Sequence, residues 1–449
     1  MFSKILIANR GEIAVRVIRA CKEMGIATVA IYSEADKDAL HVYMADEKCC
    51  IGKAISHESY LNMRNIVSAA INYGAEAIHP GYGFLSENPE FVRLCDENNI
   101  VFIGPNDKIM ENMGNKDMAR RIMHSNGIPV IPGCECVDDY SHAYEEAMKI
   151  GFPLLIKARA GGGGRGIRLV KNVGELKHCY QLAVQEAAAA FNDSFLYLEK
   201  YLTNVKHIET QILMDNYGNV VCLGERDCSI QRRNQKLVEE SPSPIVDNNL
   251  RQRLIDMSVQ VAKTVGYQGA GTIEYLYDQN DGQFYFMEMN TRLQVEHPVT
   301  EIVTGIDLVK WQIRIAADMP LVFKQQDIKI NGYAIECRIN AEDLNFKPST
   351  GKITMLHTPG GPWVRFDSAI YNGYSIPPFY DSMIGKLIVA SHSTRDEAIR
   401  KMKVALSELI IEGINHNAGL HMTIMDYEDF VTGTYTTSAL EKIFAEGGA

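Results

Sequence analysis

The amino-acid sequence predicts an α/β protein of about three domains: an N-terminal parallel sheet of βαβ units, a mobile glycine-rich lid and a mixed-sheet C-terminal domain. The first observation is length, because 449 residues exceed what one ordinary hydrophobic core holds. The second is the alternation of short apolar strands with amphipathic helices over residues 1–110. The third is a change near residue 130, where a proline-punctuated linker leads into a glycine run and then into strand-rich sequence.

The N-terminal segment is predicted to form the parallel sheet. KILIANRG (4–11) is a strand, EIAVRVIRACKEMG (12–25) is an amphipathic helix, and IATVAIYS (26–33) is a second strand. AEAIHPGYGFLSEN (75–88) is a further strand that runs into a turn. The first turn holds one glycine and lacks the pattern G-x-G-x-x-G, which argues against a dinucleotide site.

The glycine run predicts a phosphate-binding hairpin. In LLIKARAGGGGRGIRLV, a strand delivers Lys157, four glycines (161–164) and Arg165 follow, and a second strand begins after Gly166. Glycines let backbone N–H groups approach an anion closely, and the lysine can neutralise phosphate charge. The signature of a Walker loop is absent, and a flexible hairpin tip is the alternative interpretation. A mobile hairpin of this kind also suits a lid that closes over a nucleotide.

Two later stretches place polar side chains in strand-like surroundings. FLYLEKYL (195–202) encloses Glu199 and Lys200 among apolar residues and leaves the strand at Leu202, where main-chain groups can hold a purine edge. The next strand alternates His207, Glu209 and Gln211 on one face, which is either a binding face or a solvated one. The stretch ERDCSIQRRNQKLVEESP concentrates cations in an acidic chain. A solvated loop explains it, and so does a small polyanionic ligand.

The alternation in EMNTRLQVEHP (288–298) predicts a strand. One face of that strand would carry Glu288, Asn290, Arg292, Gln294 and Glu296. A hairpin at Asp281-Gly282 would bring Glu274 beside it: a two-residue turn pairs Glu274 with Met289, and a longer or bulged loop shifts it opposite Glu288. A solvated face remains the alternative interpretation.

This polar face has the chemistry of a metal and anion site. Glu274, Glu288 and Asn290 offer the oxygen ligands that Mg²⁺ or Mn²⁺ prefers. Further along, Arg292 can grip a small oxyanion and Glu296 can take a proton from it. With the glycine hairpin, these residues predict an enzyme that uses ATP and Mg²⁺ to phosphorylate a small acid.

Five stretches resemble biotin carboxylase, of the ATP-grasp superfamily: IANRGEIAVRVIRACKEMGI, IHPGYGFLSEN, GGGGRGIR, ERDCSIQRRNQK and EMNTRLQVEHPVTE. The resemblance extends from Lys4 to about Asn415. It implies an α+β ATP-grasp fold in three parts: an N-terminal pre-ATP-grasp domain at 1–114, an ATP-grasp region at 115–317 with its lid at 131–203, and a C-terminal domain at 330–440.

The resemblance also implies a reaction and its residues. ATP would phosphorylate bicarbonate to carboxyphosphate, which would transfer CO₂ to N1′ of biotin. ATP would be bound by Lys116, Lys157, Gly163, Gly164, Glu199, Lys200, Leu202, His207, Gln231, Asn234, Glu274 and Glu288. Two divalent ions would be held by Glu274, Glu288 and Asn290. Bicarbonate would be held by Lys236, Arg292, Gln294, the Val295 amide and Glu296.

Within that set, Glu296 would be the base for bicarbonate, and Arg292 and Lys236 would be catalytic with it. Tyr82 would line the biotin pocket, and Arg338 would stabilise the enolate-like ureido oxygen of biotin. One position departs from the family, which usually has His where this chain has Asn234. Asparagine can donate a hydrogen bond but cannot carry a positive charge, so a cationic contact with ATP is not expected there.

Partners follow from the resemblance as well. The Met402-Lys403 pair lacks the A-M-K-M setting of a biotinylated lysine and no biotinyl domain follows, so biotin is expected on a separate carrier protein. We expect a homodimer that serves a biotin carboxyl carrier protein and carboxyltransferase subunits, by default in acetyl-CoA carboxylase of fatty acid biosynthesis. The alternatives are a pyruvate or other acyl-CoA carboxylase, another ATP-grasp carboxylate–amine ligase, and a regulatory module without catalysis.

Composition limits the other function classes. The chain is 46% hydrophobic and 22% charged, as in ordinary globular proteins. Its net charge of −11 argues against nucleic-acid and membrane-surface binding, which need clustered positive charge. No apolar run approaches the ~20 residues of a membrane span. The ten scattered cysteines and an opening stretch that is predicted to be a strand and not a secretory segment suit a reducing, cytoplasmic compartment.

Overall fold

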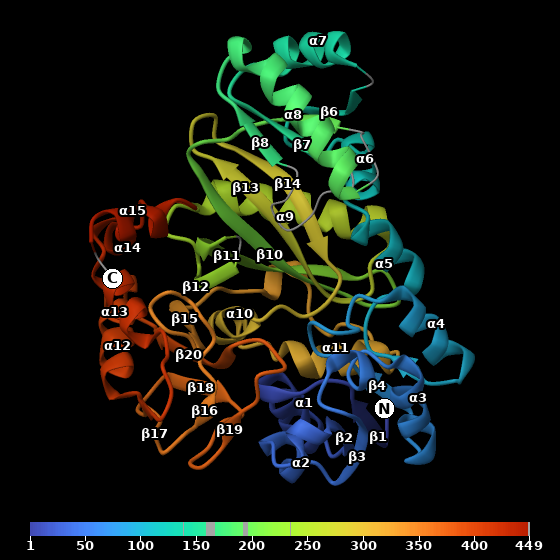
Figure 1. Cartoon of the computed structure of the whole chain (residues 1–449). Helices are drawn as coiled ribbons and strands as arrows, with labels where there is room; N and C mark the ends of the chain where they lie inside the picture. The colour runs from blue at the N-terminus through green and yellow to red at the C-terminus, as the bar shows by residue number, and fades with distance from the viewer. Residues whose placement is uncertain (138, 159–166, 192–195, 234, 448–449) are drawn as a thin grey trace. The chain divides into compact units, whose positions relative to one another are not determined.

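The computed structural model describes residues 1–137, 139–158, 167–191, 196–233 and 235–447 (Figure 1). Contacts between residues divide the chain into two compact units. The first unit comprises Met1–Asn115, Lys206–Glu274 and Glu288–Ala449, and the second comprises Lys116–Val205 and Tyr275–Met287. In the described part of the chain, no helix combines the length and the apolar character needed to cross a membrane.

The first unit begins with the predicted parallel sheet, drawn in blue in Figure 1. Its strand order is β3-β2-β1-β4-β5, and all its pairs are parallel. The strands are β1 Lys4–Ile7, β2 Ala27–Ser33, β3 Glu47–Gly52, β4 Ala77–His79 and β5 Val101–Phe102. The helices are α1 Gly11–Glu23, α2 Leu40–Met44, α3 Met63–Asn72, α4 Pro89–Glu97 and α5 Asp107–Gly114.

Helix α1 shows why this region folds as predicted. Its apolar residues recur at helical spacing, so Ile13, Val17 and Ile18 are buried against the sheet. The helix ends next to Gly25, which adopts φ +73°, a conformation that other residues rarely take. At its other end, Arg10 Nε lies 2.6 Å from the buried Asp36 Oδ2 and ties the β1–α1 turn to the segment after β2.

A second sheet carries most of the remaining strands in the order β14-β13-β10-β11-β12-β15-β20-β18. These strands are β10 Val205–Met214, β11 Val220–Arg232, β12 Gln235–Ser241, β13 Gly269–Asp278, β14 Gln283–Asn290, β15 Tyr333–Asn340, β18 Val364–Ser368 and β20 Met383–Ser391. The pairs β10–β11, β11–β12, β12–β15 and β15–β20 are antiparallel. All residues of β10 are buried, so the interpretation of its alternating polar residues as a solvated face is wrong.

The structure corrects the predicted strand over 288–298. Strand β14 ends at Asn290, residues 291–296 form a loop, and α10 (His297–Thr304) follows with Pro298 in its first turn. The polar groups of the loop find partners at both depths: Gln294 Nε2 donates to the buried Glu274 Oε1 at 3.0 Å, and the exposed Glu87 accepts the Thr291 N–H at 3.0 Å. The alternation of polar residues over 288–298 therefore indicated polar groups that face inward, and it did not indicate a continuous strand. The β13–β14 connection comprises residues 279–282, so it is longer than a two-residue turn.

The C-terminal part of the first unit packs helices and short strands around β15 and β20. A core that includes Ile335, Leu387, Met402 and Ile424 joins the sheet to these helices. The helices of this core are α12 Arg395–Glu408, α13 Ala418–Asp426, α14 Glu428–Thr432 and α15 Ala439–Ala445. Two other helices lie elsewhere in the unit: α9 Asn248–Val265 packs on β11, and α11 Leu308–Ala316 packs on α1. The short strands are β16 Gly351–Lys352, β17 Met355–His357, β19 Ser375–Ile376 and β21 Ile410–Glu412.

The second unit contains a separate four-stranded sheet in the order β6-β9-β7-β8. Its elements are α6 Lys116–Ser125, β6 Gly133–Val137, α7 Tyr140–Ile150, β7 Leu154–Ala158, β8 Ile167–Val170, α8 Val173–Phe191 and β9 Leu196–Lys200. Strands β7 and β8 pair antiparallel with Lys157 opposite Ile167, as the hairpin prediction requires. The predicted lid tip, including Gly163 and Gly164, lies outside the described residues and stays a prediction.

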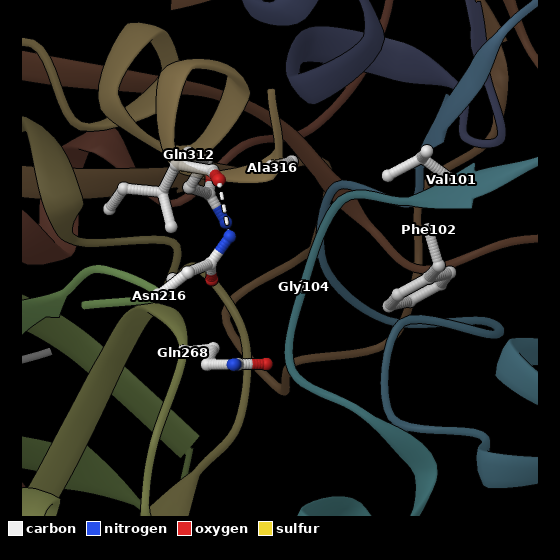
Figure 2. A pocket seen from close by; sticks show the side chains of 9 residues that line it. Val101, Phe102, Gly104, Asn216, Gln268, Gln312 and Ala316 are labelled. Atoms are coloured by element: carbon white, nitrogen blue, oxygen red, sulfur yellow. Dashed lines mark hydrogen bonds between the residues drawn. The ribbon is translucent and has the colours of Figure 1, made fainter. Parts of the chain in front are cut away.

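A cavity of about 140 Å³ lies in the first unit beside β5 and α11 (Figure 2). The carboxamides of Asn216, Gln268 and Gln312 lie along one wall, and Val101 and Phe102 lie across from them. Asn216 Nδ2 donates to the Ile315 carbonyl at 3.2 Å. None of the predicted site residues that the structure describes lines this cavity, so the candidate site must be sought elsewhere.

Candidate active site

Five charged residues of the first unit form one buried group, the central cluster: Glu209, Lys236, Glu274, Glu296 and Arg338. Lys236 Nζ, at the start of β12, lies 2.8 Å from Glu274 Oε1 and 2.7 Å from Glu296 Oε1, and it also contacts Glu209. Burial opposes a charged lysine, but the carboxylates outweigh it and raise the pKa of Lys236. The ammonium therefore stays charged and holds residues from three strands and a loop together.

Glu296 is the fully buried centre of this cluster. Its Oε1 faces Lys236, and its Oε2 accepts from Arg338 Nη2 at 2.9 Å. Burial alone would raise the pKa of Glu296, but the charges of Lys236, Arg338 and Arg226 outweigh burial and hold the pKa well below its usual value. The carboxylate is therefore ionised at neutral pH, as a proton acceptor must be.

Arg226 is the buried support beneath the cluster. Its side chain is fully buried and binds Glu209 through Nε. The other guanidinium nitrogens donate to Gln211 Oε1 at 2.8 Å, to Thr300 Oγ1 at 2.9 Å and to Thr272 Oγ1 at 3.0 Å. The residue comes from the cation-rich stretch whose alternative interpretation was a solvated loop. That interpretation is wrong for Arg226 and Lys236, which lie in the paired strands β11 and β12, whereas Arg233 is exposed in the turn after β11.

Glu274 links the cluster to the predicted metal ligands. Its Oε1 accepts from Asn290 Nδ2 at 2.9 Å and from Gln294 Nε2 at 3.0 Å, besides Lys236. Its Oε2 lies 2.9 Å from His207 Nε2. Burial raises the pKa of Glu274, but Lys236 and His207 outweigh it, so the net shift is downward.

The donor set fits a divalent ion on one side of Glu274. The ammonium of Lys236 already lies among Glu209, Glu274 and Glu296, so an ion does not fit between those carboxylates. Oε2 of Glu274, the half-buried Glu288 and the Asn290 amide offer oxygen ligands outside that space, and hard cations such as Mg²⁺ prefer oxygen.

The loop 291–296 is held by Glu87, which sequence analysis did not select. Glu87 Oε2 accepts from Arg292 Nε at 2.8 Å. The other guanidinium nitrogens of Arg292 reach Gln294 Oε1 at 3.0 Å and Asn290 Oδ1 at 3.2 Å. The sequence signal that could have identified Glu87 is its position in the HPGYGFLSEN stretch. A carboxylate in that stretch can fix a guanidinium that is distant in the sequence.

Tyr82 reaches the same loop through two further residues that sequence analysis missed. Its hydroxyl donates to Glu12, whose Oε1 lies 3.2 Å from Lys386 Nζ. Lys386 Nζ in turn donates to the Val295 carbonyl at 2.8 Å. Glu12 was read only as part of an amphipathic helix, and Lys386 lies in a strand with no local motif, so neither carried a sequence signal.

The remaining predicted residues lie on both units. In the second unit, Lys157 pairs with Glu199, Lys200 Nζ donates to the Phe152 carbonyl at 3.0 Å, and Leu202 follows the end of β9. Lys116 is the first residue of α6. In the first unit, Gln231 lies opposite Lys236 in the β11–β12 pair. Asn234 lies outside the described residues, so its predicted ATP contact stays a prediction.

Three features of this chain define the ATP-grasp class of ligases. They are a parallel-sheet domain, a small antiparallel sheet with a lysine at a strand end, and a buried carboxylate–lysine–arginine cluster. Three family models match the chain in turn. They describe a biotin carboxylase N-terminal domain at residues 1–110, a carbamoyl-phosphate synthase L chain ATP-binding domain at 115–324, and a biotin carboxylase C-terminal domain at 336–442. The chain belongs to the biotin carboxylase family.

Relatives match this chain over nearly its full length. Biotin carboxylase 1 of Bacillus subtilis is 56% identical over 98% of both chains. A pyruvate carboxylase subunit of Methanothermobacter thermautotrophicus is 52% identical over 98% of this chain and 90% of its own. The Hydrogenobacter thermophilus 2-oxoglutarate carboxylase biotin carboxylase domain dimer, with MgADP, ADP and bicarbonate, matches with a TM-score of 0.90 and 52% identity, over 99% of this chain and 98% of its own. The protein is thus an ATP-dependent enzyme that carboxylates biotin with bicarbonate.

Proposed function

We propose that this chain catalyses the first half-reaction of acetyl-CoA carboxylase, on biotin that a separate carrier protein presents. ATP phosphorylates bicarbonate, and the carboxyphosphate transfers CO₂ to N1′ of biotin. The observation that carries the proposal is the buried, ionised Glu296 between Lys236 and Arg338. A carboxylate held ionised in this way can accept a proton from bicarbonate while the two cations hold the anion.

Bicarbonate would lie against the loop 291–296. Arg292, Gln294 and the Val295 amide supply donors, and Lys236 supplies charge. Glu87 and Asn290 hold the Arg292 guanidinium in a fixed orientation, so it need not be ordered when the anion binds. Removal of the bicarbonate proton by Glu296 leaves an oxyanion that attacks the γ-phosphorus of ATP. The bond from that phosphorus to the β-phosphate oxygen breaks, so ADP leaves as carboxyphosphate forms.

ATP would be held by the residues that the resemblance implies. Lys116, Lys157, Gly163 and Gly164 would contact its phosphates, Glu199, Lys200 and Leu202 its adenine, and His207, Gln231 and Asn234 its ribose and phosphates. Glu274, Glu288 and Asn290 would hold two divalent ions, Mg²⁺ or Mn²⁺, which would neutralise charge on the phosphates. The MgADP in the Hydrogenobacter domain supports the binding of a nucleotide with Mg²⁺.

Biotin would enter beside Tyr82 and Arg338. The Arg338 guanidinium donates to Glu296 through Nη2, so its charge lies next to the carboxylation centre and can stabilise the negative ureido oxygen. We further propose that residues 1–114, 115–317 and 330–440 act as the three domains of the resemblance. The dimer would serve a biotin carboxyl carrier protein and carboxyltransferase subunits in the cytoplasm.

A second holoenzyme is supported by a specific observation. The Methanothermobacter relative, at 52% identity, belongs to a pyruvate carboxylase. The chain would then carboxylate the same biotin and pass it to a different transferase. Co-purification of the carrier with its transferase from the source cells separates the two assignments.

The test of the proposal is ATP cleavage by the purified chain with Mg²⁺, bicarbonate and free biotin. We expect cleavage to require bicarbonate and to rise when biotin is added. Carboxybiotin should accumulate in proportion to the ADP formed. Cleavage that requires an amine instead of biotin would identify another ATP-grasp ligase, and no bicarbonate-dependent cleavage would indicate a regulatory module.

A further inference from the structure

Arg338 is anchored from behind by a residue to which no role has been assigned above. Its Nε donates to Glu239 Oε1 at 2.6 Å, and its Nη2 donates to Glu296. Glu239 lies in β12 and is fully buried. The guanidinium is therefore fixed between two carboxylates, only one of which belongs to the central cluster.

A second buried carboxyl lies next to Glu239. Glu336, in β15, is directly opposite Glu239 in the antiparallel β12–β15 pair, and it is fully buried too. Directly opposed residues of an antiparallel pair point to the same face with Cβ atoms about 5 Å apart. Glu336 also precedes Arg338 by two residues, so all three side chains share one face of the sheet.

Hydrogen-bond accounting shows that this pair of carboxyls is short of donors. Glu239 Oε2 and both oxygens of Glu336 are buried, and no group in the described part of the chain donates to them. The nearby cation Lys386 donates to the Val295 carbonyl and pairs with Glu12. A buried carboxylate that is ionised without donors is costly, and two adjacent ones are costlier still.

We propose that Glu239 and Glu336 share one proton, which Glu336 carries and donates to Glu239 Oε2, and that this pair positions Arg338. Two of the three oxygens without donors, Glu239 Oε2 and the protonated oxygen of Glu336, then have a partner, and Glu239 Oε1 keeps its bond to Arg338. A single negative charge stands behind the guanidinium. Glu336 is a positioning residue that acts through Glu239, and the assignment rests on the proposed role of Arg338 in biotin carboxylation.

The electrostatics of the pair agree. Burial raises the pKa of Glu336 well above its ordinary value; Lys386 and Arg338 oppose this shift, and Glu239 and Glu296 add to it. Burial also raises the pKa of Glu239 to about 7. The charges of Arg338 and Lys236 lower this pKa, and the charge of Glu296 raises it further. At neutral pH the pair therefore holds a proton.

The shared proton matters for the chemistry. Two ionised carboxyls behind Arg338 would add a second fixed negative charge beside the place where the ureido oxygen becomes negative. With one proton on the pair, more of the positive potential of the guanidinium reaches that oxygen, and the orientation of the guanidinium is unchanged.

Infrared spectroscopy of the unliganded protein tests the proton directly. A protonated carboxyl has a C=O stretch that a carboxylate lacks, and the band shifts in D₂O. We expect such a band at neutral pH that Glu336→Gln removes. Glu225→Gln is the matched control, because Glu225 is also buried but is held by Arg251 Nε at 2.9 Å and Nη2 at 2.7 Å. Absence of a band sensitive to Glu336→Gln overturns the proposal, whether or not the protein carboxylates biotin.

Kinetics tests the positioning role with two neutral replacements. Glu336→Gln keeps a donor to Glu239, so kcat/KM for free biotin should stay within about threefold of the natural chain. Glu336→Leu keeps the volume and removes the donor, so KM for biotin should rise about tenfold while KM for ATP and the melting temperature change little. Equal behaviour of the two variants would overturn the role, and absence of biotin-dependent turnover in the natural chain would instead refute the proposed function.

Discussion

Two buried groups of charge in the first unit differ in how their cations and carboxylates are matched. One is the central cluster, where Lys236 is shared among carboxylates from three segments. The other, which we call the C-terminal tie, connects strands β10, β11 and β12 to the C-terminal helices. It consists of Lys206, Asp227, Glu240, Arg395 and Tyr435.

The C-terminal tie is a set of matched pairs. Lys206 Nζ lies 2.9 Å from Asp227 Oδ2 and 3.4 Å from the centre of the Tyr435 ring, and both charged side chains are fully buried. Arg395 binds both oxygens of Glu240, at 2.6 and 2.9 Å. Its remaining donors reach the carbonyls of Phe430 and Val431. Complete pairing of this kind holds elements together and leaves no charge for a ligand.

The central cluster leaves its charge incompletely matched. Glu296 must share its cations with Glu209, Glu274 and Glu239, and the adjoining Glu239 and Glu336 have oxygens without donors in the described structure. Incompletely paired buried charges of this kind cost free energy in the free protein. They can also bind cations, anions and protons. The comparison teaches that the completeness of pairing, more than burial, separates a structural ion pair from a site.

The largest expected effect comes from the centre of the cluster. Glu296→Ala should reduce biotin carboxylation about a thousandfold, because it removes the proposed base, while ATP still binds. Steady-state turnover and equilibrium titration with ATP measure the two quantities. Glu225→Gln, outside both groups, should keep its turnover. Nearly normal turnover of the Glu296→Ala variant would remove Glu296 from the base role.

The next largest effect is expected at the C-terminal tie, where a substitution should lower stability and leave turnover unchanged. Lys206→Met leaves Asp227 buried without its cation and should lower the free energy of unfolding by about 3 kcal/mol. Turnover of the folded variant at low temperature should be unchanged, since the tie holds no substrate. Denaturant unfolding measures the loss. The control is Lys53→Met, because Lys53 is exposed and its ion pair with Glu58 is 3.4 Å long, so stability should change little. Equal losses in the two variants would contradict the structural role.

A smaller effect is expected at the edge of the cluster. Arg338→Ala should lower kcat/KM for biotin about a hundredfold, because one charge-assisted contact to the ureido oxygen is lost. The ATP dissociation constant should change less than about threefold by the same reasoning. If nucleotide affinity fell as much as turnover, Arg338 would belong to the ATP site.

The smallest effect is a difference in acid sensitivity. The folded pKa values of Glu274 and Glu296 lie below their unfolded values, because Lys236 outweighs their burial. Their stabilising contribution is therefore present above the unfolded pKa of about 4 and is lost as the pH falls through the folded pKa values. Glu296→Gln should give a shallower decline of the urea midpoint between neutral and acid pH. An identical decline in the natural chain would contradict this linkage.

Much of the site was predictable, for reasons that particular residues show. Glu274, Asn290, Gln294 and Glu296 were selected from local patterns, and the structure brings them together around Lys236. The strand predicted over 288–298 was correct only as far as Asn290, where β14 ends; beyond it the polar groups alternate in a loop as they would in a strand. Glu87 was missed because its partner Arg292 is 205 positions away.

By itself, the sequence determined the N-terminal elements and the kinds of chemical group available, because helical and strand periodicities and short motifs are local properties of a chain. Only the tertiary structure decided which of those groups become neighbours. Glu239 supports Arg338 from 99 positions away and lies opposite Glu336, because strands β12 and β15 pair in one register. Cross-strand register depends on packing of the whole sheet, and no local pattern encodes it.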